Sequence, residues 1–252
     1  MAKSSDLKET EHLILRMPAQ VTSADADLWG RIKPGALVNL LIQAAIRSAD
    51  QLGFGFDRLR QQNLFWVLSR LTIRIDQIAR WPQLLIVETW PKDIDRLYYL
   101  RDFFIIDEEG HQMVAATSAW LAINAERKRP SRVENTGDLA FTRLRDKQAI
   151  RELPEKLPAL GDTKLLYGYL PLYTDFDVNG HVTATRYVDL MCNALPVEFW
   201  SENYPSGLAI NYLRETLPGT LLDIRQDRAN PNHFAGHHSP SGETSFLGKL
   251  QF

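Results

Sequence analysis

The sequence predicts an α+β fold built twice, in which each copy has a long buried helix wrapped by a curled antiparallel sheet. Three observations support this prediction. Two segments have the pattern of nearly enclosed helices, each is followed by strand-like segments, and the two halves match at a fixed offset. With 252 residues, 44% of them hydrophobic and 24% charged, the chain is able to bury a substantial core.

The first predicted helix covers residues 36–47 and follows Pro34, a residue that suits the first turn of a helix. Its polar side chains recur every four positions and form one narrow stripe. A surface helix would have a wider polar face, so we expect protein on most sides of this one. A second helix is predicted over residues 183–195 and ends before Pro196. The stripe residues of the two helices are Asn39, Gln43 and Arg47, and Arg186, Asp189 and Asn193.

Strand-like segments rich in β-branched and aromatic residues follow each helix, and turn signals such as Glu109-Gly110 separate them. Between the two sets lies a charged stretch with three prolines, at residues 127–162, which is typical of a crossover linker. We therefore expect an N-terminal domain at 1–135, a linker at 136–161 and a C-terminal domain at 162–252. The predicted strands are 64–75, 84–90, 97–106 and 113–123 in the first half, and 208–217, 221–226, 232–238 and 245–252 in the second.

The two halves align when the first is shifted by 150 residues. Asp27 then falls on Asp177, Gly30 on Gly180, and Gln43 on Asn193, a conservative match. Together with the shared order of elements, these matches favour an internal duplication. A helix wrapped by a curled antiparallel sheet, present twice, is the tandem hot-dog architecture. Two such sheets are able to join edge to edge, which removes exposed strand edges.

Charge, cysteine content and hydropathy exclude several classes of protein. The formal net charge is −2, so the chain is not built to wrap nucleic acid by charge alone. Cys192 is the single cysteine, which rules out a disulfide framework and fits a reducing compartment. The first 20 residues lack an apolar run long enough for a signal peptide or a membrane span. We therefore expect a soluble, cytoplasmic protein with no membrane partner.

The richest polar cluster, residues 173–182, lies just before the second helix. Asp177, Asn179 and His181 are two positions apart, so an extended loop would project all three to one side. His181 comes close to the helix start, where free N–H groups and the helix dipole favour a developing negative charge. These parts suit an acyl-transfer or hydrolysis site, although a polar turn that caps the helix would show the same pattern.

A second candidate is Glu215, within the predicted strand 208–217. In that register Glu215 shares a side with Leu213 and Leu217. A carboxylate on an apolar face indicates a buried acid that has a function. The alternative is an ordinary exposed glutamate on a strand.

Several motifs carry a resemblance to a known family: residues 63–70 (NLFWVLSR), 87–90 (VETW), the Arg101-Asp102 pair, 118–120 (SAW) and 177–182 (DVNGHV). With them, over about residues 32–222, the chain resembles the acyl-acyl carrier protein thioesterases of plant plastids and bacteria. The resemblance implies hydrolysis of fatty acyl-acyl carrier protein to free fatty acid, with no metal or organic cofactor because water is the co-substrate. The family's catalytic residues fall on Asp177, Asn179, His181 and Glu215.

Plant members of that family often have a cysteine after the glutamate, where this chain has Thr216. A cysteine nucleophile thus has no support here, and Cys192 is interpreted as a core thiol. Two routes remain open. Glu215 and His181 activate a water molecule, with Asn179 positioning it and Asp177 orienting the site, or Asp177 attacks the carbonyl and water cleaves the resulting anhydride.

The first half lacks this chemistry, because the offset of 150 places Trp29 and Arg31 at the positions of Asn179 and His181. Glu215 is expected to correspond to an apolar position near Ile73. The apolar helix and aromatic strands of this half suit a long acyl chain, which is also where the family has its chain-selecting pocket. The residues expected to line it are Leu41, Ala44, Ala45 and Ser48.

Alternative interpretations are an acyl-CoA thioesterase, a hot-dog dehydratase of 3-hydroxyacyl thioesters, and a non-catalytic acyl-binding protein. A dehydratase has no need of a water-activating Glu215, and a binding protein has no need of the four polar residues together. We expect a monomer, as an internal pseudo-dimer, or a homodimer. The basic residues Arg127, Lys128, Arg129 and Arg132 could attract the acidic carrier protein, and His233, His237 and His238 are interpreted as surface histidines rather than zinc ligands.

Overall fold

The computed structural model describes residues 10–134 and 139–252. Within these residues, eleven strands form one continuous sheet with antiparallel pairing throughout. The strand order is β1-β3-β4-β5-β2-β8-β11-β10-β9-β7, with the short β6 beside β5. The strands of the first half are β1 (Leu15–Gln20), β2 (Leu64–Ile75), β3 (Leu84–Asp95), β4 (Tyr98–Asp107), β5 (Gln112–Asn124) and β6 (Pro130–Ser131), and those of the second are β7 (Thr163–Tyr169), β8 (Gly207–Tyr212), β9 (Leu221–Asp227), β10 (His233–Ser239) and β11 (Thr244–Gln251).

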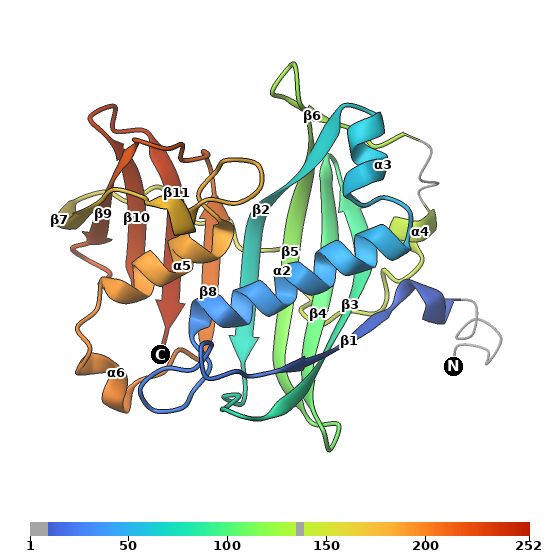
Figure 1. Cartoon of the computed structure of the whole chain (residues 1–252), viewed down its shortest axis with the longest axis horizontal. Helices are drawn as coiled ribbons and strands as arrows, with labels where there is room; N and C mark the ends of the chain where they lie inside the picture. The colour runs from blue at the N-terminus through green and yellow to red at the C-terminus, as the bar shows by residue number, and fades with distance from the viewer. Residues whose placement is uncertain (1–9, 135–138) are drawn as a thin grey trace.

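The strand order shows the duplication directly. Read outwards from the centre of the sheet, the first half runs β2-β5-β4-β3-β1 and the second runs β8-β11-β10-β9-β7. The two halves meet where β2 pairs with β8, from Arg70 opposite Asn211 to Arg74 opposite Gly207. Two hot-dog units therefore share one sheet with no edge between them, and the predicted tandem architecture is confirmed (Figure 1).

Two main helices cover the same face of this sheet (Figure 1). Helix α2 (Pro34–Gln51) starts at the expected proline, and α5 (Ala184–Asn193) lies within the predicted second segment. Helix α2 extends one turn beyond the prediction because Ser48 and Ala49 continue its buried face. Shorter helical segments are α3 (Phe56–Gln61), α4 (Leu139–Thr142), α6 (Phe199–Glu202) and the 3-10 turns η1 (Glu11–Leu13) and η2 (Tyr173–Asp175).

The hydrophobic core lies between these helices and the sheet and is shared by both halves. Leu41 of α2 and Met191 of α5 belong to one cluster that also includes Ile73 of β2 and Ile210 of β8. Gly35 in the first turn of α2 lies against Asp189 of α5, where a Cβ atom would collide with the carboxylate. This close approach allows the two helices to pack against each other over the central strands.

The segment between the halves runs along the opposite face of the sheet. The N–H of Glu155 binds Thr72 Oγ1 on β2, and the N–H of Leu157 binds Asn211 Oδ1 on β8. The Leu157 side chain is buried in a small cluster with residues of β8, β10 and β11. The linker therefore fastens both half-sheets across the strand pair at which they join.

The structure differs from the sequence prediction in several features, among them the short elements α3, α4, α6 and β6, which were not predicted. The edge strands β1 and β7 were not predicted, because most of their side chains are partly or fully exposed and show no clean alternation. Strand β3 extends five residues past the predicted end at Trp90 and includes Pro91, which a bulge accommodates. Strand β8 ends at Tyr212, so Glu215 lies in the following loop. Glu215, Leu213 and Leu217 are all exposed, and the interpretation of Glu215 as a buried strand acid was wrong.

Candidate active site

A tight turn carries three of the predicted site residues. Phe176 and Val182 form an isolated antiparallel bridge, and the residues between them close with a hydrogen bond from the Gly180 N–H to the Asp177 carbonyl, 3.0 Å. Gly180 has a φ of +76°, a conformation that glycine adopts without steric strain. The expected extended loop is therefore replaced by a compact turn that directs His181 towards the start of α5.

The Asp177 carboxylate holds this turn together. Its Oδ1 atom accepts the backbone N–H of Asn179 at 2.8 Å and that of His181 at 3.3 Å. Asn179 and Asp177 are exposed, whereas the His181 side chain is mostly covered. The structure thus gives Asp177 a structural task within the turn, which the spacing of the three residues had not indicated.

His181 meets Glu215 across two separate segments of the chain. Its Nε2 atom lies 3.0 Å from Glu215 Oε2, and the two side chains are 23% and 47% exposed. The backbone brings them together because the N–H of Val182 donates to the Thr216 carbonyl at 3.0 Å. An imidazole paired with a solvent-accessible carboxylate is suited to take a proton from a water molecule and deliver it to a leaving group.

The first half contains the same turn without this chemistry. Asp27 Oδ1 accepts the N–H groups of Trp29 and Arg31, both at 2.9 Å, and Gly30 has a φ of +71°. In place of an imidazole, the guanidinium of Arg31 binds the Asp27 carboxylate at 2.9 Å. The backbone of the turn is therefore duplicated, and its reactive side chains are not.

Segments of the second half close this inactive turn. Arg31 donates to the carbonyls of Trp200 and Asn203, in and after α6, and is 6% exposed. The N–H of Ile32 donates to the Ala79 carbonyl, as the N–H of Val182 donates to the Thr216 carbonyl. Ala79 therefore corresponds to Thr216, and the residue before it, Ile78, corresponds to Glu215. The counterpart of Glu215 is thus apolar, as expected, but lies five positions beyond the predicted Ile73.

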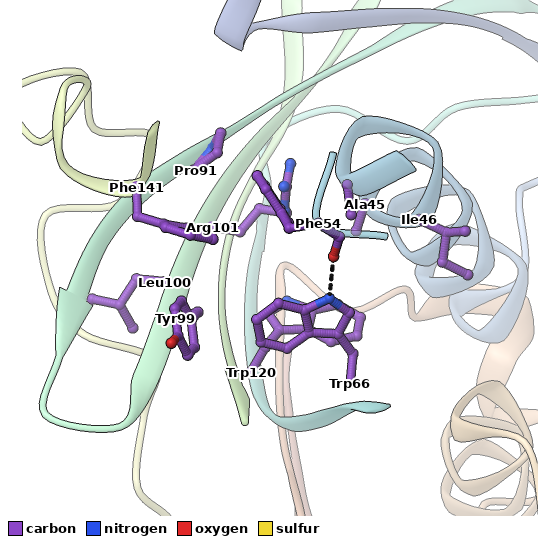
Figure 2. Close-up of a pocket in the computed structure, with 11 residues that line it drawn as sticks. Ala45, Ile46, Phe54, Trp66, Pro91, Tyr99, Leu100, Arg101, Trp120 and Phe141 are labelled. Carbon is purple, nitrogen blue, oxygen red and sulfur yellow. Dashed lines mark hydrogen bonds between the residues drawn. The ribbon is translucent and has the colours of Figure 1, made fainter. Parts of the chain in front are cut away.

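A pocket of about 430 Å³, open mouth included, lies between α2 and the sheet of the first half. Its walls are aromatic and aliphatic, and the Trp66 Nε1–H donates to the Phe54 carbonyl at 2.9 Å (Figure 2). Sequence reasoning missed most of the wall, because its aromatic residues lie on five separate segments, the loop after α2 and the elements β2, β4, β5 and α4. The lining residues are Ala45, Ile46, Ala49, Phe54, Trp66, Pro91, Tyr99, Leu100, Arg101, Trp120 and Phe141.

The four residues expected to bind the acyl chain have different environments. Ala45 lines the pocket, while Ala44 and Leu41 are fully buried in the main core. Ser48 Oγ accepts a hydrogen bond of 2.9 Å from Arg101, whose side chain contributes to the pocket wall. Burial lowers the pKa of Arg101 to about 9.

The pocket and the His181–Glu215 pair lie at the same end of the sheet. Strand β2 pairs with β8 from Arg70 onwards, so its first residues, including Trp66, extend past the end of β8. Glu215 follows the last residue of β8 by three positions, in the same direction. The opposite neighbour of β2, strand β5, ends at Asn124, so the basic loop with Arg127, Lys128 and Arg129 also lies at this end.

Cys192, His237 and His238 do not have the surroundings of a catalytic nucleophile or of metal ligands. Burial raises the pKa of the Cys192 thiol. His238 Nε2 lies 3.0 Å from Thr216 Oγ1, and His237 Nδ1 lies 3.1 Å from the Gly242 carbonyl. Over the part of the chain that the structure describes, the one group spaced to hold a cation is Asp107, Glu109 and His111, in the β4–β5 turn.

Fold and site together define a double hot-dog protein with one hydrolase-like His–Glu pair and one inactive copy of the turn. Residues 13–137 match the acyl-ACP thioesterase N-terminal domain, and residues 162–248 match the acyl-ACP thioesterase C-terminal domain. The chain therefore belongs to the acyl-ACP thioesterase family, which confirms the resemblance of its motifs.

Similar proteins include plant enzymes and bacterial structures. A palmitoyl-acyl carrier protein thioesterase of Gossypium hirsutum is 29% identical over 191 residues, which are 71% of this chain and 46% of that protein. The oleoyl-acyl carrier protein thioesterase 2 of Arabidopsis thaliana is 26% identical, over 78% of this chain and 58% of that protein. The chain thus spans about half the length of the curated relatives it matches.

Among solved structures, an acyl-ACP thioesterase from Bacteroides thetaiotaomicron has a TM-score of 0.85 and 26% identity, and the similarity covers 96% of this chain and 98% of that one. The 12:0-ACP thioesterase from Umbellularia californica shows the same fold, with a TM-score of 0.82 and 23% identity over 95% and 96% of the two chains. Among residues 10–134 and 139–252, no helix has the length and hydrophobicity that spanning a membrane requires.

Proposed function

We propose that this protein hydrolyses the thioester of fatty acyl-acyl carrier protein and releases free fatty acid. The observation that carries the proposal is the 3.0 Å contact between His181 and Glu215, at the same end of the sheet as an apolar pocket. Membership of the acyl-ACP thioesterase family supports it, as do the names of the plant relatives. The pocket holds the acyl tail, and the pair acts on the carbonyl at its head.

In the proposed mechanism Glu215 and His181 together remove a proton from water as the water attacks the thioester carbonyl. His181 then returns a proton to the departing thiolate. The N–H groups at the start of α5, with the helix dipole behind them, stabilise the oxyanion. Asn179, two residues from His181 on the same turn, positions the water.

The contacts of Asp177 favour water as the nucleophile over Asp177 itself. Its Oδ1 atom accepts two backbone N–H groups, and such hydrogen bonds stabilise the carboxylate and lower its nucleophilicity. Asp177 therefore orients the site, and no covalent acyl-enzyme is formed.

The chain divides in function as it does in topology. Residues 1–135 form the domain that holds the acyl chain through Ala45, Arg101 and the aromatic wall, 136–161 form the linker, and 162–252 form the catalytic domain. Ser48 shapes the pocket through Arg101, and Leu41 and Ala44 support it from the core. The proposal includes a cytoplasmic location, consistent with the single cysteine, and a monomer or homodimer as the active form.

The carrier protein is expected to dock at the sheet end that contains the pocket and the pair. The β5–β6 loop places Arg127, Lys128 and Arg129 there as exposed cations, with Arg132 directly beyond β6. Acyl carrier proteins are acidic, so these residues would speed association by electrostatic attraction. An acyl-CoA thioesterase is the second candidate, because the apolar pocket and the His–Glu pair would serve either carrier.

The test is an assay of free thiol and free acid from acyl-acyl carrier protein and acyl-CoA substrates. His181→Ala and Glu215→Gln should each lower kcat by at least ~10²-fold while the thermal melt stays close to wild type. Asn179→Ala should be impaired to a lesser extent. Glu243→Gln is the matched control, because Glu243 is an exposed carboxylate that pairs with Arg214 and not with His181. With a 3-hydroxyacyl thioester as a parallel substrate, a 2-enoyl product would identify a dehydratase. Near-normal turnover of the Glu215 variant would remove that residue from the mechanism.

A further inference from the structure

The loop that carries Glu215 is attached to β11 by a set of hydrogen bonds to the buried residue Ser245. The backbone N–H groups of Leu213 and Arg214 both donate to the Ser245 carbonyl, at 2.8 and 3.1 Å. The Ser245 hydroxyl donates in turn to the Arg214 carbonyl at 2.9 Å. The two peptide groups before Glu215 are therefore fixed to a single residue of the sheet.

Thr216 fixes the other side of Glu215. Its side chain is fully buried, and its Oγ1 atom lies 3.0 Å from Ser245 Oγ and 3.0 Å from His238 Nε2. Its carbonyl accepts the N–H of Val182, one residue after His181. Thr216 therefore connects the loop, the turn and the strand β10 that carries His238.

The number of protons available for donation fixes the donor and the acceptor of each hydrogen bond in this cluster. A hydroxyl has a single proton to donate, and the Ser245 hydroxyl donates to Arg214, so the Thr216 hydroxyl is the donor to Ser245. His238 must then donate from Nε2 to Thr216. The chain runs from the His238 Nε2–H to the Thr216 hydroxyl, to the Ser245 hydroxyl and to the Arg214 carbonyl. Both the imidazolium and the neutral Nε2–H tautomer supply the first donor.

We propose that His238, Thr216 and Ser245 form a hydrogen-bonded relay that positions Glu215 against His181. The inference rests on the proposed catalytic role of Glu215. A glutamate that is 47% exposed at its side chain has little packing of its own to hold it, so the backbone on either side must supply its geometry. A chain in which each hydroxyl both accepts and donates is cooperative, so losing one member weakens the others. The three are positioning residues, because their hydroxyl and imidazole groups bind one another and the Arg214 carbonyl, and Ser245 and Thr216 also interact with the buried Tyr187 hydroxyl.

The test uses an isosteric series at Thr216, measured by kcat, KM and thermal melting on an acyl-acyl carrier protein substrate. Thr216→Val preserves the shape and removes the hydroxyl, and it should lower kcat about 10-fold with KM unchanged, because a small misplacement of a catalytic group affects turnover. Thr216→Ser keeps the hydroxyl and should restore most of the activity. Ser245→Ala should resemble Thr216→Val, and it provides the same test if the valine variant does not fold. His237→Ala is the matched control, because this neighbour on β10 binds the Gly242 carbonyl instead of Thr216.

A double-mutant cycle separates positioning from a general structural effect. If the relay acts through Glu215, adding Thr216→Val to Glu215→Gln should lower kcat no further than Glu215→Gln alone. If the two losses multiply, or if Thr216→Ser is as slow as Thr216→Val, the relay does not act through Glu215 and the inference is overturned. Wild-type turnover of Glu215→Gln alone would instead refute the proposed mechanism, and the inference with it.

Discussion

Replacing Ala45 with phenylalanine should shorten the acyl chain that the protein prefers. Ala45 belongs to α2, is 4% exposed and lines the apolar pocket together with aromatic residues that include Phe54 and Trp66. A benzyl group in place of the methyl would project into the space that a bound tail occupies. The catalytic turn and Glu215 lie on other segments and stay unchanged.

The size of the effect follows from the methylenes that the ring displaces. At ~0.8 kcal/mol for each buried methylene, displacement of two corresponds to roughly 1.6 kcal/mol of lost transition-state stabilisation. That loss is about 15-fold in kcat/KM for a substrate long enough to reach the ring. A substrate whose acyl chain is too short to reach the ring should keep its original kcat/KM.

The assay is kcat/KM over a series of acyl-acyl carrier proteins that differ by two carbons. The neighbouring Ala44→Phe variant is the matched control, because Ala44 is fully buried in the core and does not line the pocket. Overpacking there should cost about 1–3 kcal/mol of stability and lower the melting temperature without changing the ratios between chain lengths. A folded Ala45→Phe protein with the wild-type chain-length profile would refute the reasoning and place the tail outside this pocket.

Three further predictions concern other parts of the molecule. Cys192→Ala should retain wild-type kcat. The native thiol should react slowly with iodoacetamide, because burial raises its pKa and little thiolate is present. A folded but inactive Cys192→Ala variant would restore the thiol as a candidate nucleophile. Reversing the charges of Lys128 and Arg129 should raise KM for the protein-bound substrate about fivefold at low salt and leave acyl-CoA analogues unaffected, and an unchanged KM would exclude this loop from docking. Lys92→Met should cost about 3–5 kcal/mol in urea unfolding, because it leaves the Asp102 carboxylate buried without its partner at 3.3 Å. Burial already raises the pKa of Asp102, so this loss should shrink as the pH falls and the carboxyl is protonated, and a pH-independent loss would contradict the explanation.

Local pattern was sufficient for much of the fold. Pro34 and the narrow polar stripe that follows it marked the start and the enclosed character of α2, because helix periodicity is written into neighbouring residues. Strand β2 has the predicted bounds of 64–75, since both the apolar residues and the turns around it are local signals. The offset of 150 found the duplicated turn, and both copies have the same backbone hydrogen bonds around Gly30 and Gly180.

Contacts between distant residues were decided by the tertiary structure alone. The sequence named both His181 and Glu215, but their contact depends on where β8 ends and on the bond between Val182 and Thr216. The closure of the inactive turn required Arg31 to meet carbonyls about 170 positions away. Thr216 appeared in the sequence only as the residue in place of a cysteine, and its part in a relay with Ser245 became visible once β11 lay beside the loop. The periodicity of a segment indicates which of its faces is buried. Contacts between residues far apart in the chain depend on how the whole sheet packs, and neither segment alone carries a sequence signal for them.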